Sequence, residues 1–154
     1  HIVPDNLKEL IQNIKKLKTD PKHQERAHES LVEDFFCAIG YEKHRHIKYR
    51  IGRIDISIWQ KEKPILIAEV KKDWNLNSYN YQDAVKQAYI YAQEKGAQYV
   101  VVTNGDYYAL FDRSKGLSYK SNKVGEFKLT ALEEKHLNII NELKLENLLN
   151  YNLE

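Results

Sequence analysis

The sequence predicts a domain of the α/β or α+β class, built around a mixed central β-sheet. The chain has 154 residues, a length that suits one domain better than two independent cores. Apolar residues recur at helical spacing in some segments and at strand spacing in others. Hydrophobic residues make up 42% of the chain and charged residues 30%, which is enough apolar surface to offset the entropy of ordering it.

Two amphipathic helices are expected before the sheet. Five aliphatic residues at helical spacing predict the first helix over about 5–18: Leu7, Leu10, Ile11, Ile14 and Leu17. Asp20 and Pro21 are typical of a helix start, so they predict a second helix from about that point to Ile39. Gly40 is well placed to end this second helix.

Strand patterns begin at Ile47. Alternating isoleucines predict a strand over 54–58, and residues 47–51 predict its antiparallel partner across a turn that contains Gly52. The nearly continuous apolar run over 65–70 predicts a central strand covered on both faces.

The second half of the chain alternates again between the two patterns. A helix is expected from Ser78 or Asn80 to Lys95, followed by strands over 99–103 and 107–111 that an Asn-Gly-Asp turn joins into a hairpin. The polar stretch 112–125 predicts no element, and a possible capping box at Thr130 and Glu133 predicts a last helix. We therefore expect a single domain over 1–154, with its core at about 22–113 and helical additions at about 5–18 and 130–150.

A polar pair stands within the apolar run of the central strand. Glu69 and Lys71 are two residues apart and share one face, whereas Val70 faces the other side. Charged groups near the end of a buried strand are costly unless they have partners or a function. Asp55 lies among isoleucines on the neighbouring predicted strand, and pairing of the two strands would bring it close to Glu69.

Two carboxylates held that close repel each other unless a cation lies between them. Carboxylate and carbonyl oxygens are hard ligands, which favour Mg²⁺ or Mn²⁺ over zinc. Lys71 would then stand where it can orient a water molecule or stabilise developing charge. The alternative interpretation is an ordinary ion pair at the edge of the sheet.

Three further residues accompany this pattern. Glu29 lies on the helix before the sheet, and Gln87 and Tyr91 share one face of the later helix because they are four residues apart. Asp55, Glu69-Val70-Lys71 and the string 87–92 resemble the PD-(D/E)XK nuclease signature with the QxxxY motif of its RecB-like and restriction branches. Ile54 stands where the signature has proline, its loosest position. More closely, the stretch from about Glu25 to Phe111 is similar to the N-terminal nuclease domain of type I restriction enzyme R (motor) subunits. That likeness includes Gly40-Tyr41 and the turn over 102–105.

The resemblance implies a three-layer, restriction-endonuclease-like fold and metal-dependent hydrolysis of phosphodiester bonds. The metal ligands that it implies are Asp55, Glu69, the carbonyl of Val70 and Glu29. Glu33, one helical turn after Glu29, competes for the helix position. Lys71 resembles the lysine that positions and activates the attacking water, and Gln87 and Tyr91 resemble helix residues that support the site and contact nucleic acid. The implied cofactor is Mg²⁺, with Mn²⁺ as a substitute.

We therefore expect a Mg²⁺-dependent DNA endonuclease of restriction or host-defence type. Two alternatives stay open: a catalytically silent nucleic-acid-binding module, and a junction-resolving or repair nuclease on the same fold. The expected partners are DNA, helicase or motor domains or other subunits absent from this chain, and a second copy of the chain in a homodimer. No apolar run approaches the length of a membrane span, and Cys37 is the single cysteine, so a cytoplasmic location without a membrane partner is expected.

Several other residues have two interpretations each. Four cations near the expected site either contact phosphates or are solvated surface: Lys48, Arg50, Arg53 and Lys72. His44, His46 and Cys37 lack the spacing of a zinc site. Five aromatic residues either pack within the domain or stack on unpaired bases: Trp74, Tyr79, Tyr81, Tyr89 and Tyr91. The net charge of +2 looks modest for a nucleic-acid partner, but it counts carboxylates that would gather around a cation.

Overall fold

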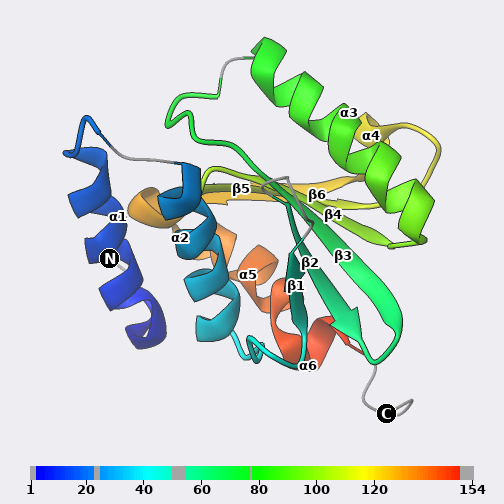
Figure 1. Ribbon diagram of the computed structural model, residues 1–154, viewed down its shortest axis with the longest axis horizontal. Helices are drawn as coiled ribbons and strands as arrows, with labels where there is room; N and C mark the ends of the chain where they lie inside the picture. The colour runs from blue at the N-terminus through cyan, green and yellow to red at the C-terminus, as the bar shows by residue number, and fades with distance from the viewer. Residues whose placement is uncertain (1–2, 23–24, 50–54, 77, 150–154) are drawn as a thin grey trace.

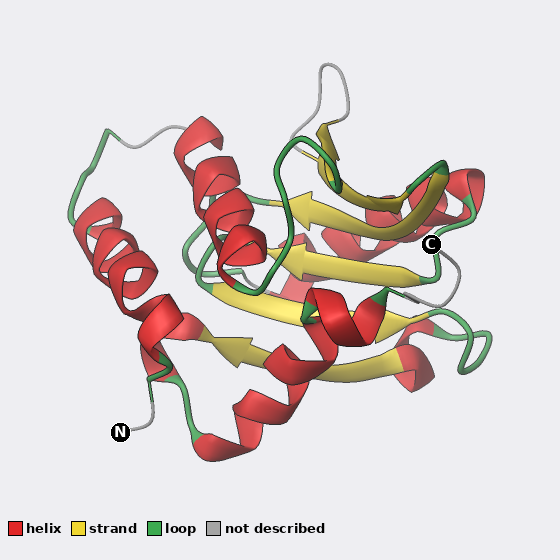
Figure 2. Cartoon of the chain, turned by 90° about the horizontal axis from the view of Figure 1, so that it is seen from below, coloured by secondary structure: helices red, strands yellow, loops and turns green. Residues whose placement is uncertain are grey.

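The computed structural model describes residues 3–22, 25–49, 55–76 and 78–149, with the backbone alone described for Glu25, Asp55 and Ser78. Within these residues, six strands form one sheet in the order β1-β2-β3-β4-β5-β6 (Figure 1; Figure 2). The strands are β1 (Ile47–Tyr49), β2 (Asp55–Gln60), β3 (Lys63–Val70), β4 (Tyr99–Thr103), β5 (Tyr107–Asp112) and β6 (Lys123–Lys128).

Helices cover both faces of this sheet (Figure 1). One face carries α3 (Ser78–Lys95), whose alanines pack against Ile67, Val102 and Phe111. The opposite face carries α1 (Lys8–Lys18), α2 (Glu25–Ala38) and α5 (Leu137–Leu143), which share a second apolar cluster with alternate residues of the strands. The α+β class that the sequence predicts and the three-layer arrangement that the family resemblance implies are both confirmed. No helix in the described ranges is long and apolar enough to cross a membrane.

The sheet is mixed because one connection crosses over it. β3 and β4 are parallel, and α3 joins them, as a parallel pair requires. The pairs β1–β2, β2–β3, β4–β5 and β5–β6 are antiparallel. The predicted stop of α3 is confirmed: the helix ends at Lys95, and Gly96 adopts a φ of +75°.

The predicted end of the second helix is also confirmed, but its start is wrong. The Tyr41 amide donates to the carbonyl of Phe36 at 3.0 Å, and Gly40 between them has a φ of +117°, the geometry of a glycine-terminated helix. At the other end, α2 begins at Glu25. The Asp20 carboxylate accepts a hydrogen bond from the Lys22 amide at 2.9 Å, so Asp20 forms a local turn instead of capping the helix.

The turn between β4 and β5 forms as its Asn-Gly-Asp sequence predicts. The side chain of Asn104 accepts hydrogen bonds from the amides of Asp106 and Tyr107, and Gly105 has a φ of +95°. A side chain at Gly105 would also lie close to α2, because a Cβ atom there would come within 3.1 Å of the Leu31 Cβ. Only glycine suits both the backbone and the space.

Replacing Gly105 by Ala should lower the free energy of unfolding by about 1–3 kcal/mol, because the new side chain adopts an unfavourable φ and meets Leu31. Urea denaturation measures the change. Gly96→Ala is the matched control, since Gly96 also has a positive φ but no atom lies within 4 Å of its added Cβ. If Gly96→Ala lowered the free energy of unfolding as much as Gly105→Ala, the result would contradict a role for the Leu31 contact.

The sixth strand begins in the stretch for which the sequence predicts no element, since residues 123–125 of β6 lie within 112–125. β6 pairs with β5, but the register shifts between Leu110, which pairs with Gly125, and Phe111, which pairs with Lys123. This irregularity adds one residue to β6 and breaks its period of two, so two residues that pack into the same core, Val124 and Phe127, are three positions apart instead of two. The alternation that reveals β2 is therefore absent from β6.

The single helix predicted from Thr130 is wrong. The chain forms two 3₁₀ turns, Leu129–Ala131 and Glu134–His136, and then the short helices α5 and α6 (Leu145–Leu148). Thr130 cannot start a helix because its amide and hydroxyl both donate to the Asp106 carboxylate, at 2.9 and 2.8 Å. A capping box does form, but between Glu133 and His136. Two further short elements are the 3₁₀ turn Asp5–Leu7 and α4 (Tyr119–Asn122).

Candidate active site

The backbone register of β2 and β3 sets Asp55 directly opposite Glu69. Ile56 pairs with Ala68 and Ser57 with Ile67, so the register is regular at this end of the strands. The one irregularity between them falls at the far end, between Ile58 and Trp59. The predicted pairing of the two strands is thus confirmed, whereas the side chain of Asp55 lies outside the described residues.

Glu69 is a buried carboxylate near the end of a central strand. Only 5% of the residue is exposed, and it pairs with Val102 of β4 on its other side. Alternate residues of β3 face opposite ways: Ala68 and Val70 belong to the core beneath α2, and Ile67 belongs to the core beneath α3. Glu69 therefore shares the α3 face with Ile67, and Val70 points away from it, as the sequence predicts.

Lys71 follows directly at the end of β3. Its amide donates to the carbonyl of Thr103 at 2.8 Å, which continues the pairing with β4 and fixes the backbone. Its Nζ lies 3.9 Å from Oε1 of Glu69 and donates to Oε1 of Gln87 at 3.3 Å. The ammonium is thus held between a strand carboxylate and a helix amide, with about a third of the side chain exposed.

Helix α3 also supplies Asp83, which is not among the site residues predicted from the sequence. Gln87 donates through Nε2 to Oδ2 of Asp83 at 2.9 Å, so the amide is oriented with its oxygen toward Lys71. Asp83, Gln87 and Tyr91 are spaced four apart on one face of α3, and this spacing was the available signal for Asp83. Tyr91 lies one turn beyond Gln87, with Nζ of Lys95 at 5.7 Å from its ring centre.

The two candidates on α2 differ in their contacts. Glu33 forms an ion pair with Lys43 at 3.1 Å. Glu29 has no hydrogen bond or ion pair within the described part of the chain; burial raises its pKa, an effect that Arg26 opposes and Glu33 reinforces. Neither carboxylate contacts Glu69 or Lys71 among the described contacts, so the structure joins Glu69, Lys71 and Gln87 but not the α2 residues.

The histidines that the structure describes do not gather with Cys37 into a zinc site. His46 is buried, and its Nδ1 accepts a hydrogen bond from the Glu42 amide at 3.0 Å, while Cys37 is exposed. Among the described residues, which leave out the side chain of Asp55, no three acidic, histidine or cysteine side chains lie close enough together to hold a metal ion.

The cations and aromatic residues near the site differ in what they contact. Nζ of Lys48 lies 4.0 Å from the centre of the Trp59 ring, Lys72 is exposed, and Arg50 and Arg53 lie outside the described residues. Tyr89 packs against Phe111 and Tyr119, which supports the packing interpretation for that residue. Tyr79 is exposed.

Comparison with known proteins identifies the family. No curated protein and no solved structure gives a significant match to the chain. A family model described as type I restriction enzyme R protein N terminus (HSDR_N) matches residues 37–126. The matched stretch runs from the end of α2 into β6, so it contains the whole arrangement of β2, β3 and α3 that holds Asp55, Glu69, Lys71 and Gln87. Because the match covers more than half of the chain, and the three-layer fold agrees with it, this chain belongs to the family of the type I restriction enzyme R protein N terminus.

Proposed function

We propose that the chain is a DNA endonuclease of restriction or host-defence type that hydrolyses phosphodiester bonds with Mg²⁺, for which Mn²⁺ can substitute. The observation that supports this most is the buried Glu69 with Asp55 opposite it in register and Lys71 at the exit of the strand. All three lie in the part of the chain that the restriction-enzyme family covers. DNA is the proposed substrate, and the remaining domains or subunits of a restriction enzyme are the proposed partners.

The donor atoms at this position fit a hard divalent cation. Residues opposite each other in an antiparallel pair have Cβ atoms about 4.5–5.5 Å apart, so the register of Asp55 and Glu69 suits two carboxylates that share one ion. The Val70 carbonyl would add a third oxygen, and Glu29 would add a carboxylate directly or through water. Oxygen donors of this kind are those that Mg²⁺ takes in proteins. When bound, the ion would neutralise phosphate charge and lower the pKa of a water molecule.

Lys71 is placed to act on the attacking water and on the phosphate. An ammonium has three N–H donors. Gln87 accepts one of them, and the 3.9 Å separation from Glu69 is an ion-pair distance rather than a hydrogen bond. The donors directed away from Gln87 can orient a water molecule and stabilise the negative charge that develops on the phosphate. Such a group contributes most in the transition state.

Gln87 and Asp83 act on Lys71 by holding it in place. The hydrogen bond from Gln87 to Asp83 fixes the amide, and the amide oxygen fixes the ammonium. Gln87 is therefore a positioning residue for Lys71, and Asp83 is a positioning residue for Gln87. A loosely held ammonium would lose part of its effect on the reacting atoms.

Replacing Asp83 by Ala should lower kcat for DNA cleavage about tenfold and leave KM nearly unchanged. The physical reason is that the amide of Gln87 would lose the acceptor that orients it. Asp83→Asn is the matched variant, since its side-chain oxygen can still accept from Nε2 of Gln87 and should restore most of the rate. Equal kcat values for the Ala and Asn variants would show that this hydrogen bond does not position Lys71.

The proposed activity is tested by incubating supercoiled, linear and single-stranded DNA with the protein in Mg²⁺, in Mn²⁺ and in chelator. We expect strand cleavage with either metal, none with chelator, and none with the Asp55→Ala protein. Cleavage that persists in Asp55→Ala would refute the proposed site. Failure of the wild-type protein to cut any of the three substrates would refute the proposed activity.

A further inference from the structure

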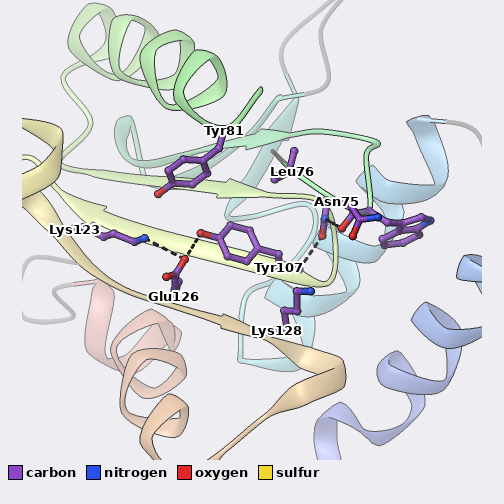
Figure 3. A pocket seen from close by; sticks show the side chains of 9 residues that line it. Asn75, Leu76, Tyr81, Tyr107, Lys123, Glu126 and Lys128 are labelled. Carbon is purple, nitrogen blue, oxygen red and sulfur yellow. Dashed lines mark hydrogen bonds and ion pairs between the residues drawn. The ribbon is translucent and has the colours of Figure 1, made fainter. Parts of the chain in front are cut away.

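A cavity of about 440 Å³ opens over β5 and β6, on the face of the sheet that α3 covers (Figure 3). The face follows from the register: Glu126 pairs with Ala109, which belongs to the core beneath α3. Its walls come from residues 74–76, from Tyr81 on α3, and from Tyr107, Lys123, Glu126 and Lys128. Glu69 lies on this same face, and the segment after Lys71 leads directly into the wall of the cavity.

One side of the cavity is a compact cluster whose charges compensate each other. The Tyr107 hydroxyl donates to Oε2 of Glu126, and Nζ of Lys123 lies 3.1 Å from the same oxygen. Burial, followed by the hydrogen bond to Glu126, raises the pKa of the Tyr107 phenol, which therefore stays neutral. Burial alone would raise the pKa of Glu126, but the hydrogen bonds from Tyr107 and Lys123 outweigh it and hold that pKa down. A neutral phenol makes Tyr107 a ring surface rather than a nucleophile.

The other side of the cavity carries a cation without such compensation. Lys128 pairs with Tyr107 across β5 and β6 and is exposed. Within the described ranges it forms no ion pair, unlike Lys123 at the other end of β6. Figure 3 shows Lys128, Asn75 and Leu76 around the end of the cavity away from Lys123. The cavity thus offers one uncompensated positive charge, one exposed side-chain amide and an apolar side chain.

The aromatic surface of the cavity consists of two tyrosine rings. Tyr81 and Tyr107 meet edge to face, with ring centres 6.1 Å apart. Trp74 contributes less, because its ring packs against His28 at 4.2 Å. The wall that carries Trp74 and Asn75 is held in position, since the side chain of Asn104 donates to the carbonyls of Asp73 and Trp74 at 2.9 and 3.2 Å. A site built in this way loses little entropy when a ligand binds.

We propose that this cavity binds an unpaired nucleotide of a DNA strand. The base would lie against the tyrosine rings and Leu76, and the neighbouring phosphodiester would contact Lys128. Base stacking on aromatic rings requires no particular sequence, and the cavity volume falls in the range of about 300–1,000 Å³ that is typical of ligand sites. The choice of DNA rests on the proposed function, because the same strand would extend across the face that carries Glu69 and Lys71.

Charge and access favour a strand over a free nucleotide or an intact duplex. One phosphodiester carries one negative charge, which Lys128 alone can match, whereas a free nucleotide phosphate carries more. A base inside a duplex is paired and stacked, so it cannot enter a cavity without leaving the helix. The site would therefore distinguish single-stranded or locally opened DNA from fully paired DNA. The proposal gives Tyr81 the role of stacking on a base, which is one of the two roles that the sequence leaves open for it.

The test measures the fluorescence anisotropy of a short labelled oligonucleotide as it binds. Chelator is present, so that metal-dependent cleavage does not occur. The wild-type protein should bind the single strand more tightly than the same sequence as a blunt duplex. Tyr81→Ala should weaken binding of the single strand about tenfold and leave duplex binding unchanged. Tyr81→Phe keeps the ring and should bind as the wild type does, and the unchanged duplex binding of Tyr81→Ala excludes a folding defect as the cause.

The phosphate contact has its own measurement and control. Lys128→Gln should reduce the slope of log affinity against log salt concentration by about 0.7, the value for one contact to a single strand. Lys16→Gln removes an equal charge from α1, on the opposite side of the sheet, and should leave the slope unchanged. Wild-type affinity in Tyr81→Ala would overturn the proposal. A deoxynucleoside monophosphate that binds as tightly as the oligonucleotide would overturn the assignment to a strand.

The two proposals fail separately. If the protein cleaves DNA with Mg²⁺ but Tyr81→Ala binds single strands normally, the cavity proposal is wrong and the endonuclease proposal stands. If binding of single strands depends on Tyr81 but no DNA is cut with any metal, the endonuclease proposal is wrong and the cavity proposal stands.

Discussion

Replacing Lys71 by Ala is expected to lower the rate of DNA cleavage by about 10²–10³-fold while the affinity for DNA changes much less. The ammonium lies 3.9 Å from Glu69 and 3.3 Å from Gln87, so its loss removes a positive charge from the proposed site. Single-turnover kinetics separates the cleavage step from binding. Because the effect belongs to the transition state, the loss should appear in kcat rather than in KM.

Lys63→Ala is the matched control for this change. Lys63 begins β3, the same strand that ends in front of Lys71, and it is exposed. Its replacement removes the same charge from the far end of the strand and should leave the cleavage rate unaltered. A melting curve for Lys71→Ala shows whether the variant stays folded. A folded Lys71→Ala protein that cuts DNA at the wild-type rate contradicts the proposed role of the lysine.

Replacing Asp106 by Ala is expected to lower the free energy of unfolding by about 3–5 kcal/mol, because the change removes an ion pair with Lys18 and leaves the amide and hydroxyl of Thr130 without their acceptor. The Asp106 side chain is almost fully buried, and its carboxylate lies 2.5 Å from Nζ of Lys18. It also accepts from the amide and hydroxyl of Thr130. One carboxylate in the β4–β5 turn thus ties α1 and the C-terminal segment to the sheet, and chemical denaturation measures what it contributes.

An exposed ion pair at the start of α1 provides the comparison. Asp5 lies 2.7 Å from Nζ of Lys8, but both side chains are largely exposed. Solvent screens a pair of that kind and leaves it little net effect on stability. Asp5→Ala should therefore unfold at the same denaturant concentration as the wild type. Similar losses in both variants would show that burial of Asp106 is not the source of its effect.

Much of the sheet could be predicted because its sequence signals are local. The alternation in β2 and the continuous apolar run in β3 determine which residues face the helices. Strand pairing in sequence order then places Asp55 opposite Glu69. The Asn-Gly-Asp turn and Gly96 also act within a few residues of themselves. These features need no knowledge of distant contacts.

The features that sequence reasoning missed depend on contacts between distant residues. The register shift between β5 and β6 removes the alternation that would have predicted β6. The hydrogen bond from the Thr130 amide to Asp106, 24 residues away, prevents the predicted helix start. Asp106 looks like an ordinary turn residue, although one of its partners, Lys18, lies 88 residues before it. Asp83 looks like a solvated surface acid until its bond to Gln87 is seen.

The central claim is that Glu69 and Asp55 together hold a divalent cation, and Mn²⁺ binding to the whole chain, measured by calorimetry, tests it most directly. Glu62→Gln, in the turn between β2 and β3, serves as a control for the loss of one carboxylate. We expect the wild-type and Glu62→Gln proteins to bind Mn²⁺ equally well, and both Glu69→Gln and Asp55→Asn to lose this binding. Unchanged Mn²⁺ affinity in either of those two variants would contradict the claim.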